Sequence, residues 1–287
     1  MIKKIAFIGA TGMLGRPVIH QLTEAGFDVT ALVRSPDRAD LGDKLRLIKG
    51  DLKNPEDVDQ LLEGKDAVYI SLSILQNEKE NDWHTETDGM KIILASAQKK
   101  SIQRILLLSS LVQRYQRMNN FSWWVFGLKD ESVEMVKQSG ISYTIFFPST
   151  FMESFLGKYR QGKRILLGGK SEHRMYYIAG EDYGKQVAQT LLRNHEENKE
   201  YVIQGLEALT QEEAADIFVQ HYKREKLSIS KAPLGILKFL GLFSTTVNYG
   251  ARIVEALNKY PEKFESEETW KALGKPVTTL QKFAESA

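Results

Sequence analysis

The chain has 287 residues, of which 42% are hydrophobic and 26% are charged, enough for one large α/β domain or a domain with a smaller lobe. The formal net charge of +2 leaves no basic surplus for nucleic acid, and the absence of cysteine excludes disulfides and thiolate catalysis. The longest apolar stretch, residues 232–243, is too short to span a bilayer. We therefore expect a cytoplasmic protein without a transmembrane segment or secretory signal.

The chain begins with a strand, a glycine-rich turn and a helix. An apolar strand covers residues 5–8, and a helical pattern covers residues 17–25. This order is the context in which a glycine motif predicts dinucleotide binding, the alternative being a tight turn without a ligand. The turn reads Gly9-Ala10-Thr11-Gly12-Met13-Leu14-Gly15.

Each glycine of this turn has a separate expected role. Gly9 permits the sharp turn, Gly12 lets a pyrophosphate approach the backbone, and Gly15 lets the helix pack closely. The N-terminus of the helix then faces the phosphates with free N–H groups and its positive dipole end. We expect the cofactor to contact the residues of this turn, which are Gly9, Thr11, Gly12, Met13, Leu14 and Gly15.

Strands and helices then alternate, which predicts a parallel, doubly wound Rossmann sheet. The helices are stabilised by local signals such as the cap, proline and acids of Asn54-Pro55-Glu56-Asp57. Strands are predicted over 28–33, 45–49, 67–71, 104–109 and 143–147, and helices over 55–62, 85–99 and 129–139.

The rhythm changes after Pro148. A further helix (181–192) and strand (201–204) continue the sheet, and a capping box, Thr210-Gln211-Glu212-Glu213, opens another helix. We assign residues 1–150 and about 176–206 to the dinucleotide-binding domain. Residues of about 151–175 and 207–287 form a small, mostly helical substrate lobe over the carboxyl edge of the sheet. Within this lobe we expect residues 232–243 to be buried, the alternative being a helix for a membrane surface or a partner.

The end of the second strand indicates which dinucleotide is bound. An NAD site places an acid there to accept from the ribose 2′-hydroxyl, whereas this chain has Arg34, Ser35 and Arg38. A guanidinium pairs with a 2′-phosphate, so these residues favour NADP(H) over the alternative of a solvated basic loop.

Several motifs together resemble the NmrA-like group of atypical short-chain dehydrogenases/reductases, which bind NAD(P). The resemblance covers nearly the whole chain but is not specific for a substrate. The motifs are the glycine turn, Val33-Arg34-Ser35-Pro36, Lys49-Gly50-Asp51-Leu52, Leu107-Leu108-Ser109-Ser110, Lys129-Asp130-Glu131, residues 139–145 with Pro148, and residues 274–280.

The resemblance implies cofactor contacts beyond the glycine turn. Asp51 and Leu52 would contact adenine, although Asp51 has the alternative role of capping its own loop. Ser71 and Leu72 would lie along the cofactor, and Lys129 would bind the nicotinamide ribose. The nicotinamide would be bordered by Pro148 and Ser149, and Ser109 ends the fifth strand at the same edge.

The chain departs from the wider superfamily at the proton donor. Reductases of that superfamily place a tyrosine four residues before the lysine, where this chain has Val125. Tyr115 is the candidate substitute, together with Ser109 and Ser110; its alternative is an ordinary loop tyrosine. Lys129 and Tyr115 are therefore the expected catalytic residues of an atypical oxidoreductase.

Aromatic residues precede Lys129. They line an apolar pocket or pack between the sheet and the lobe; the residues are Phe121, Trp123, Trp124 and Phe126. We expect an NADPH-dependent reductase of an apolar carbonyl or quinone-like small molecule. The alternative is a non-catalytic NADP(H)-sensing regulator or assembly factor with a protein partner. A metal site is not expected, because His84 and His173 are isolated.

Overall fold

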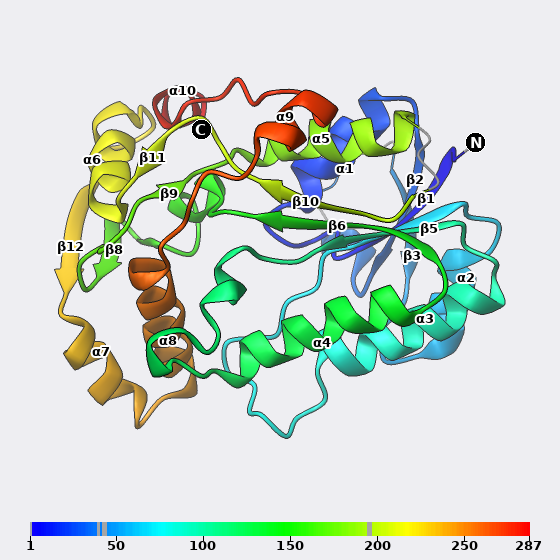
Figure 1. Cartoon of the computed structure of the whole chain (residues 1–287), viewed down its shortest axis with the longest axis horizontal. Coiled ribbons are helices and arrows are strands. Elements are labelled where there is room, and N and C mark those ends of the chain that lie inside the picture. Colours follow the sequence, from blue (N-terminus) through cyan, green and yellow to red (C-terminus); the bar gives the residue numbers. More distant parts are fainter. Residues whose placement is uncertain (1, 39–40, 42–44, 194–196) are drawn as a thin grey trace.

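A seven-stranded parallel sheet forms the centre of the molecule (Figure 1). The computed structural model describes residues 2–38, 41, 45–193 and 197–287, without the side chain of Arg38. In spatial order the strands are β10 (Lys199–Ile203), β6 (Ser142–Pro148), β5 (Arg104–Leu108), β4 (Ala67–Ile70), β1 (Lys4–Ile8), β2 (Asp28–Val33) and β3 (Arg46–Lys49).

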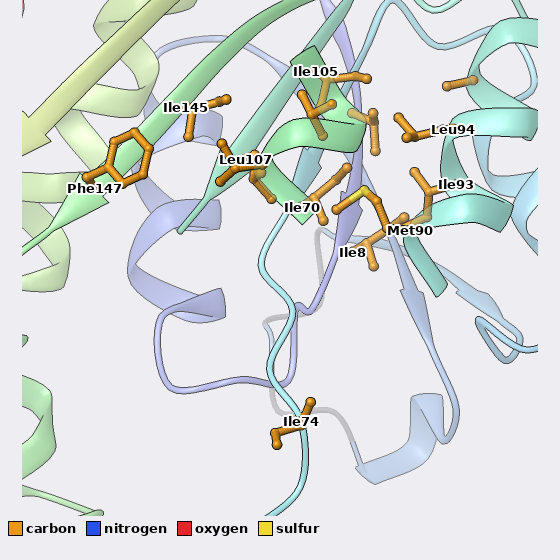
Figure 2. Close-up of a cluster of buried hydrophobic side chains, with 14 of the residues drawn as sticks. Ile8, Ile70, Ile74, Met90, Ile93, Leu94, Ile105, Leu107, Ile145 and Phe147 are labelled. Carbon is orange, nitrogen blue, oxygen red and sulfur yellow. The ribbon is translucent and has the colours of Figure 1, made fainter. Parts of the chain in front are cut away.

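Helices cover both faces of this sheet, which confirms the doubly wound fold. On one face α1 (Gly15–Glu24) packs against α5 (Gly180–Leu192). On the other face lie α2 (Pro55–Leu62), α3 (Met90–Lys99) and α4 (Trp124–Gln138). Figure 2 shows the core between this second layer and the sheet. Its residues include Ile8, Ile70, Met90, Ile93, Ile105, Leu107 and Ile145.

The remaining elements form a lobe beside the sheet. As expected it is largely helical, with α6 (Gln211–His221), α7 (Leu234–Gly241), α8 (Thr245–Lys259) and α10 (Leu280–Ser286). It also contains two small sheets that the sequence analysis did not predict. They are formed by β12 (Ser228–Ala232), β8 (Arg164–Gly168) and β7 (Arg160–Gln161), and by β11 (Ala208–Leu209) and β9 (Met175–Tyr176).

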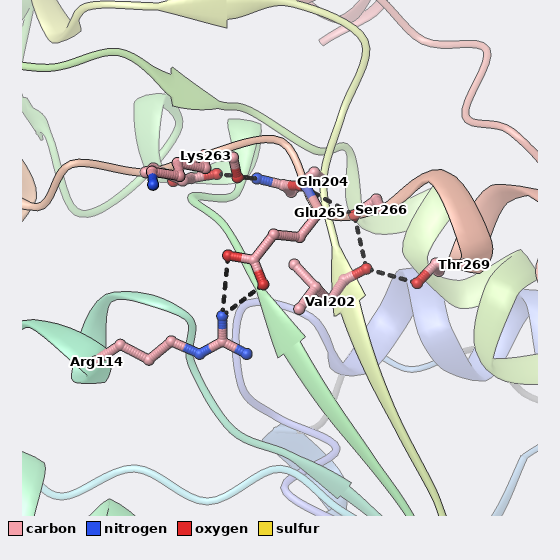
Figure 3. A network of polar contacts seen from close by, with 8 residues as sticks. Arg114, Val202, Gln204, Lys263, Glu265, Ser266 and Thr269 are labelled. Atoms are coloured by element: carbon pink, nitrogen blue, oxygen red, sulfur yellow. Dashed lines mark hydrogen bonds and ion pairs between the residues drawn. The ribbon is translucent and has the colours of Figure 1, made fainter.

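A polar network ties the chain after α8 to the end of β10 (Figure 3). Gln204 donates to the backbone carbonyl of Lys263 at 2.8 Å and accepts from the N–H of Glu265 at 2.7 Å. Ser266 and Thr269 both donate to the carbonyl of Val202. This network leads the chain into α9 (Glu267–Leu273), which packs against α5 rather than within the lobe.

Two sequence expectations need correction. Helix α4 begins at Trp124 instead of Lys129. Aromatic and β-branched residues have low helix propensity, but Val125 and Phe126 become buried in the core when this segment is helical. Residues 232–243 are not buried in the lobe: Phe239 and Phe243 are 62% and 78% exposed. At the start of α4, tertiary packing thus overrides helix propensity. Along residues 232–243, packing leaves an apolar surface uncovered.

Short helical turns connect the main elements. They are η1 (Pro36–Arg38), η2 (Thr85–Gly89, a π-helical turn), η3 (Val112–Tyr115), η4 (Met118–Asn120) and η5 (Met152–Phe155). Across the described ranges, no helix combines the length and apolar character that crossing a bilayer requires.

Candidate functional site

The parallel sheet brings the predicted site residues to one edge. Ile8 of β1 pairs with Leu32 of β2 and with Ile70 of β4, so the residues that follow these strands lie side by side. The strand order reverses between β1 and β4, which is where open α/β sheets bind ligands. The predicted residues directly after the strands are Gly9, Arg34, Ser71 and Ser109, and Pro148 ends β6 at the same edge.

Two glycines of the turn are required by the fold itself. Gly9 has φ +94°, and a Cβ there would lie 2.0 Å from the carbonyl oxygen of Ser71. A Cβ on Gly15 would lie 1.7 Å from the carbonyl oxygen of Ala10. The turn and the start of α1 therefore tolerate no side chain at these positions, in agreement with the expected sharp turn and close packing.

Gly12 differs, because a Cβ there would meet only the carbonyl oxygen of Gly9, at 3.1 Å. Thr11 and Gly12 are exposed and Met13 is half-buried. Leu14, the residue before α1, makes no side-chain cap, and the first turn holds no acidic residue. The N-terminus of α1 is thus open to an anion, and these residues fit a bound pyrophosphate.

The end of β2 presents Arg34 and Ser35 to solvent at the same edge. The backbone of Arg38 lies in η1, but its side chain is outside the described residues. Arg34 and Ser35 are therefore free of burial, as contact with a cofactor phosphate requires.

The residues expected to contact the adenine of the cofactor are Asp51, in a loop, and the apolar Leu52, and Leu72 is expected to lie along the cofactor. Asp51 Oδ1 accepts the backbone N–H of Lys53 at 2.9 Å, so Asp51 does cap its own loop. This bond uses one carboxylate oxygen of an exposed residue. Leu52 and Leu72 are half-buried and pack against the core below α3. The structure thus places these residues at the edge without assigning them a ligand.

Ser109 belongs to a chain of hydrogen bonds that the sequence did not suggest. Its hydroxyl donates to Gln113 Oε1 at 2.6 Å, and Gln113 Nε2 donates to Asp130 Oδ1 at 2.9 Å. Burial raises the pKa of Asp130. Near Pro148, Ser149 donates to Glu262 Oε2 at 2.8 Å. Both strand ends are therefore rigidly held.

Lys129 is paired with a buried acid. Its Nζ donates to Glu86 Oε1 at 2.5 Å, and the two side chains are 17% and 4% exposed. Burial alone would lower the pKa of Lys129, but the Glu86 carboxylate outweighs it and raises that pKa. The second oxygen of Glu86 is buried and finds no hydrogen-bond partner among the described residues. Glu86, which lies in η2, thus fixes the position of the Lys129 ammonium group. The sequence analysis predicted a role for Lys129 but none for Glu86.

Tyr249 of α8 is the second residue that sequence reasoning missed. Its ring packs edge-on against Trp123 at 5.0 Å, and its hydroxyl lies within reach of Ser73. Burial raises the pKa of Tyr249, while the nearby Lys129 opposes that rise. A tyrosine beside a lysine is the pairing expected of a proton donor. Because Tyr249 lies far along the chain, no local spacing could have revealed it.

A cavity of about 440 Å³ opens beside Tyr249. Its walls come from the loop after β4, the start of α4 and the turn between α7 and α8. The lining residues include Gln76, Glu78, Trp123, Trp124, Leu242, Phe243, Asn248 and Tyr249. Of the four predicted aromatics, Phe121, Trp123 and Phe126 are buried in the core, while Trp123 and Trp124 also line this cavity. The packing role is therefore present, and two of these aromatics also line a cavity, but polar and charged residues such as Lys79 and Glu80 share that lining, so the cavity is not the apolar pocket that was expected.

His84 braces one wall of the cavity. Nδ1 lies 2.8 Å from Glu78 Oε2 and Nε2 lies 3.1 Å from the carbonyl oxygen of Glu80, so both ring nitrogens face acceptors. Although burial opposes it, these partners raise the pKa of His84. The ring also contacts Trp124 at 5.1 Å. His84 is thereby explained as a structural residue.

Tyr115 and Val125 both lie in the core. Tyr115 is 1% exposed, contacts the ring of Phe121 at 4.9 Å, and accepts from Asn119 Nδ2 at 3.4 Å. Val125 is 1% exposed, one turn before Lys129 on α4. Neither side chain is among those that line the cavity beside Tyr249.

A buried carboxyl near the start of α5 predicts a pH-dependent stability. Glu153 accepts the N–H of Gly180 at 2.7 Å, and burial raises the pKa of Glu153 to about 7. The unfolded chain loses the Glu153 proton near pH 4.5, whereas the folded protein keeps it up to about pH 7. The free energy of unfolding should therefore fall by about 3 kcal/mol as the pH rises from about 5 to 7. Urea unfolding of Glu153→Gln should show a flatter pH profile. The exposed Glu24→Gln is the control, and equal slopes in both variants would contradict the assignment.

Comparison with known proteins agrees with this geometry. A family model described as NAD(P)H-binding matches residues 9–194. The photosystem II assembly factor Ycf39 of Guillardia theta is 25% identical over 264 residues, covering 88% of this chain and 82% of that protein. The NAD(P)H azoreductase of Xenophilus azovorans is 25% identical over 220 residues, covering 74% and 71%.

Solved structures show the same fold. A nucleoside-diphosphate-sugar epimerase from Staphylococcus aureus superimposes with a TM-score of 0.76 at 18% identity, covering 98% of this chain and 99% of that chain. The NADPH complex of an Escherichia coli NADPH-dependent quinone oxidoreductase gives 0.74 at 20% identity, with the same coverage. At this level of identity the likeness concerns the fold alone.

Proposed function

Because the chain belongs to the NAD(P)H-binding family, we propose that it is an NADPH-dependent reductase of an apolar, aromatic carbonyl or quinone-like molecule. The observation that carries the proposal is the cavity lined by Trp123, Trp124 and Tyr249, because Tyr249 interacts electrostatically with the Lys129–Glu86 pair. The aromatic side chains of the lining suit a flat ring, and the polar residues beside them suit its carbonyl oxygens. By its name the quinone oxidoreductase acts on quinones, which supports the choice, and the azoreductase is by its name another NAD(P)H-dependent reductase.

The proposal gives each part of the chain a role. Bound NADPH supplies a hydride. The glycine turn and the N-terminus of α1 would hold the pyrophosphate, and Lys129 would donate to ribose hydroxyls while Glu86 keeps it in place. Tyr249 holds a proton at the cavity wall, and Tyr115 remains the other candidate donor. Residues of about 151–175 and 207–287, apart from α9, serve as the substrate lobe. A nicotinamide-dependent reductase without cysteine suits the cytoplasm.

The cofactor preference is testable at Arg34. We expect NADP(H) to bind more tightly than NAD(H) by about ten- to hundredfold, since a charge-assisted bond to the 2′-phosphate contributes about 1.5–3 kcal/mol. Calorimetric titration of both nucleotides measures the ratio. Arg34→Ala should lose most of it, whereas Lys3→Ala, an exposed cation at the opposite end of β1, should keep it. Equal affinities in the wild type would refute the preference.

Turnover is tested by NADPH oxidation with quinones and aromatic aldehydes. With the best substrate, Tyr249→Phe should lower kcat about a hundredfold or more if Tyr249 donates the proton. Tyr115→Phe is the matched variant: a comparable loss there, with none in Tyr249→Phe, would make Tyr115 the donor. Nucleotide affinity should be unchanged in both. No loss in either variant would remove both tyrosines from the mechanism.

A second candidate is a non-catalytic NADP(H)-sensing regulator or assembly factor. Two observations favour it: the buried Val125 at the usual tyrosine position, and the relatives whose name is photosystem II assembly factor. The same screen separates the two functions. Tight NADPH binding without oxidation on any carbonyl or quinone would support the regulator.

A further inference from the structure

An unusually apolar surface lies at the end of the lobe, on α7 and the turn that follows it. Its exposed fractions are 54% for Ile236, 62% for Phe239, 47% for Leu240, 74% for Leu242 and 78% for Phe243. The rings of Phe239 and Phe243 contact each other at 5.6 Å. Figure 1 shows α7 at the periphery, remote from the N-terminal strands. A contiguous exposed patch of this kind indicates a binding surface.

The charged residues of the elements that carry this surface are mostly basic, whereas the neighbouring loop adds Glu78, Lys79 and Glu80 at the cavity. Between Glu225 and Glu255 the chain contains no acidic residue, but it contains the basic residues Lys226, Lys231, Lys238 and Arg252. Glu255, where this stretch ends, is itself surrounded by cations. Lys238 donates to it at 2.7 Å, and Lys259 and Arg252 approach it at 3.5 and 4.0 Å. Three cations around one carboxylate leave a positive local field.

We propose that α7 and the α7–α8 turn dock on an anionic lipid surface, with Phe239, Leu242 and Phe243 inserted at the headgroup boundary. Aromatic and aliphatic side chains beside lysine and arginine form the composition that binds such surfaces. The most exposed side chains, Leu242 and Phe243, stand on a turn at the rim of the cavity, and a projecting apolar turn suits insertion into lipid. Helix α7 spans only Leu234–Gly241, so the contact is interfacial.

Docking would serve the proposed reductase, and this link rests on that function. Leu242 and Phe243 belong both to the exposed surface and to the lining of the cavity beside Tyr249. An apolar substrate dissolved in the lipid could then enter the cavity without crossing water. The substrate class would accordingly be lipid-partitioning molecules.

Vesicle flotation tests the docking without nucleotide or substrate, so its outcome is independent of the proposed function. The full chain should float with vesicles of phosphatidylcholine and phosphatidylglycerol but not with phosphatidylcholine alone, and added salt should reduce binding. The double variant Phe239→Ser/Phe243→Ser should lower the bound fraction about tenfold or more. Leu192→Ser, an equally polar change at a 52% exposed position on α5, should bind as the wild type does.

Three results would overturn the proposal. They are absence of flotation with either vesicle, equal flotation with both, and full binding by the double variant. A self-association that the double variant abolishes, seen by light scattering in the absence of lipid binding, would assign the surface to a second copy of the chain. Far-ultraviolet circular dichroism of the double variant ensures that a loss of binding reflects the surface and not unfolding.

Discussion

Gly12→Val should abolish nucleotide binding and leave a cooperatively folded protein. Within the described part of the chain a Cβ at Gly12 meets only the carbonyl oxygen of Gly9, at 3.1 Å, so the added side chain occupies the path of the pyrophosphate instead of the core. We expect the affinity for NADPH to fall by at least about a hundredfold, which corresponds to about 2.7 kcal/mol. Calorimetry measures the affinity and a thermal melt measures folding.

Neighbouring glycines separate binding from folding. Gly15→Val should destabilise the protein itself, because a Cβ there lies 1.7 Å from the carbonyl oxygen of Ala10. Gly157→Val is the neutral control, since a Cβ at Gly157 meets nothing within 4 Å. Retained NADPH binding by Gly12→Val would show that this turn does not hold phosphate.

Lys129→Met should cost both stability and nucleotide affinity. The substitution leaves the Glu86 carboxylate, 4% exposed, buried without its hydrogen-bonded counter-charge, and only the more distant Lys158 then opposes its charge among the described residues. Breaking a buried pair in this way costs about 3–5 kcal/mol of unfolding free energy. The variant also lacks the ammonium that would bind the ribose, so we expect weaker NADPH binding and loss of any turnover. Urea unfolding and calorimetry measure the two effects separately.

Two further variants distinguish these effects. The double variant Lys129→Met/Glu86→Gln should recover part of the stability, because no buried charge is left, but none of the affinity. Lys137→Met removes another lysine of α4, which pairs with Glu200 at 2.8 Å near the surface, and should cost less than about 1 kcal/mol. If the double variant binds NADPH as the wild type does, Lys129 is a structural residue alone.

Local sequence determined the frame of this protein. Strand β2 and helix α2 have the predicted bounds, 28–33 and 55–62, because strand burial, an asparagine cap and a first-turn proline act within a few residues. The glycine turn was predictable for the same reason. Since the sheet is parallel, the ends of its strands must meet at one edge, and the predicted edge residues followed from the strand assignments alone.

Only the tertiary structure shows which residues accompany the predicted site residues near the carboxyl edge of the sheet. Glu86 is 43 residues from Lys129, and Tyr249 reaches the cavity from α8, so neither spacing nor composition could pair them. The start of α4 at Trp124 and the exposure of α7 were likewise set by packing. An aromatic or apolar run has the same local preferences whether or not a neighbouring element covers it. Which side chains are buried depends on contacts between distant segments, and these exist only in the folded chain.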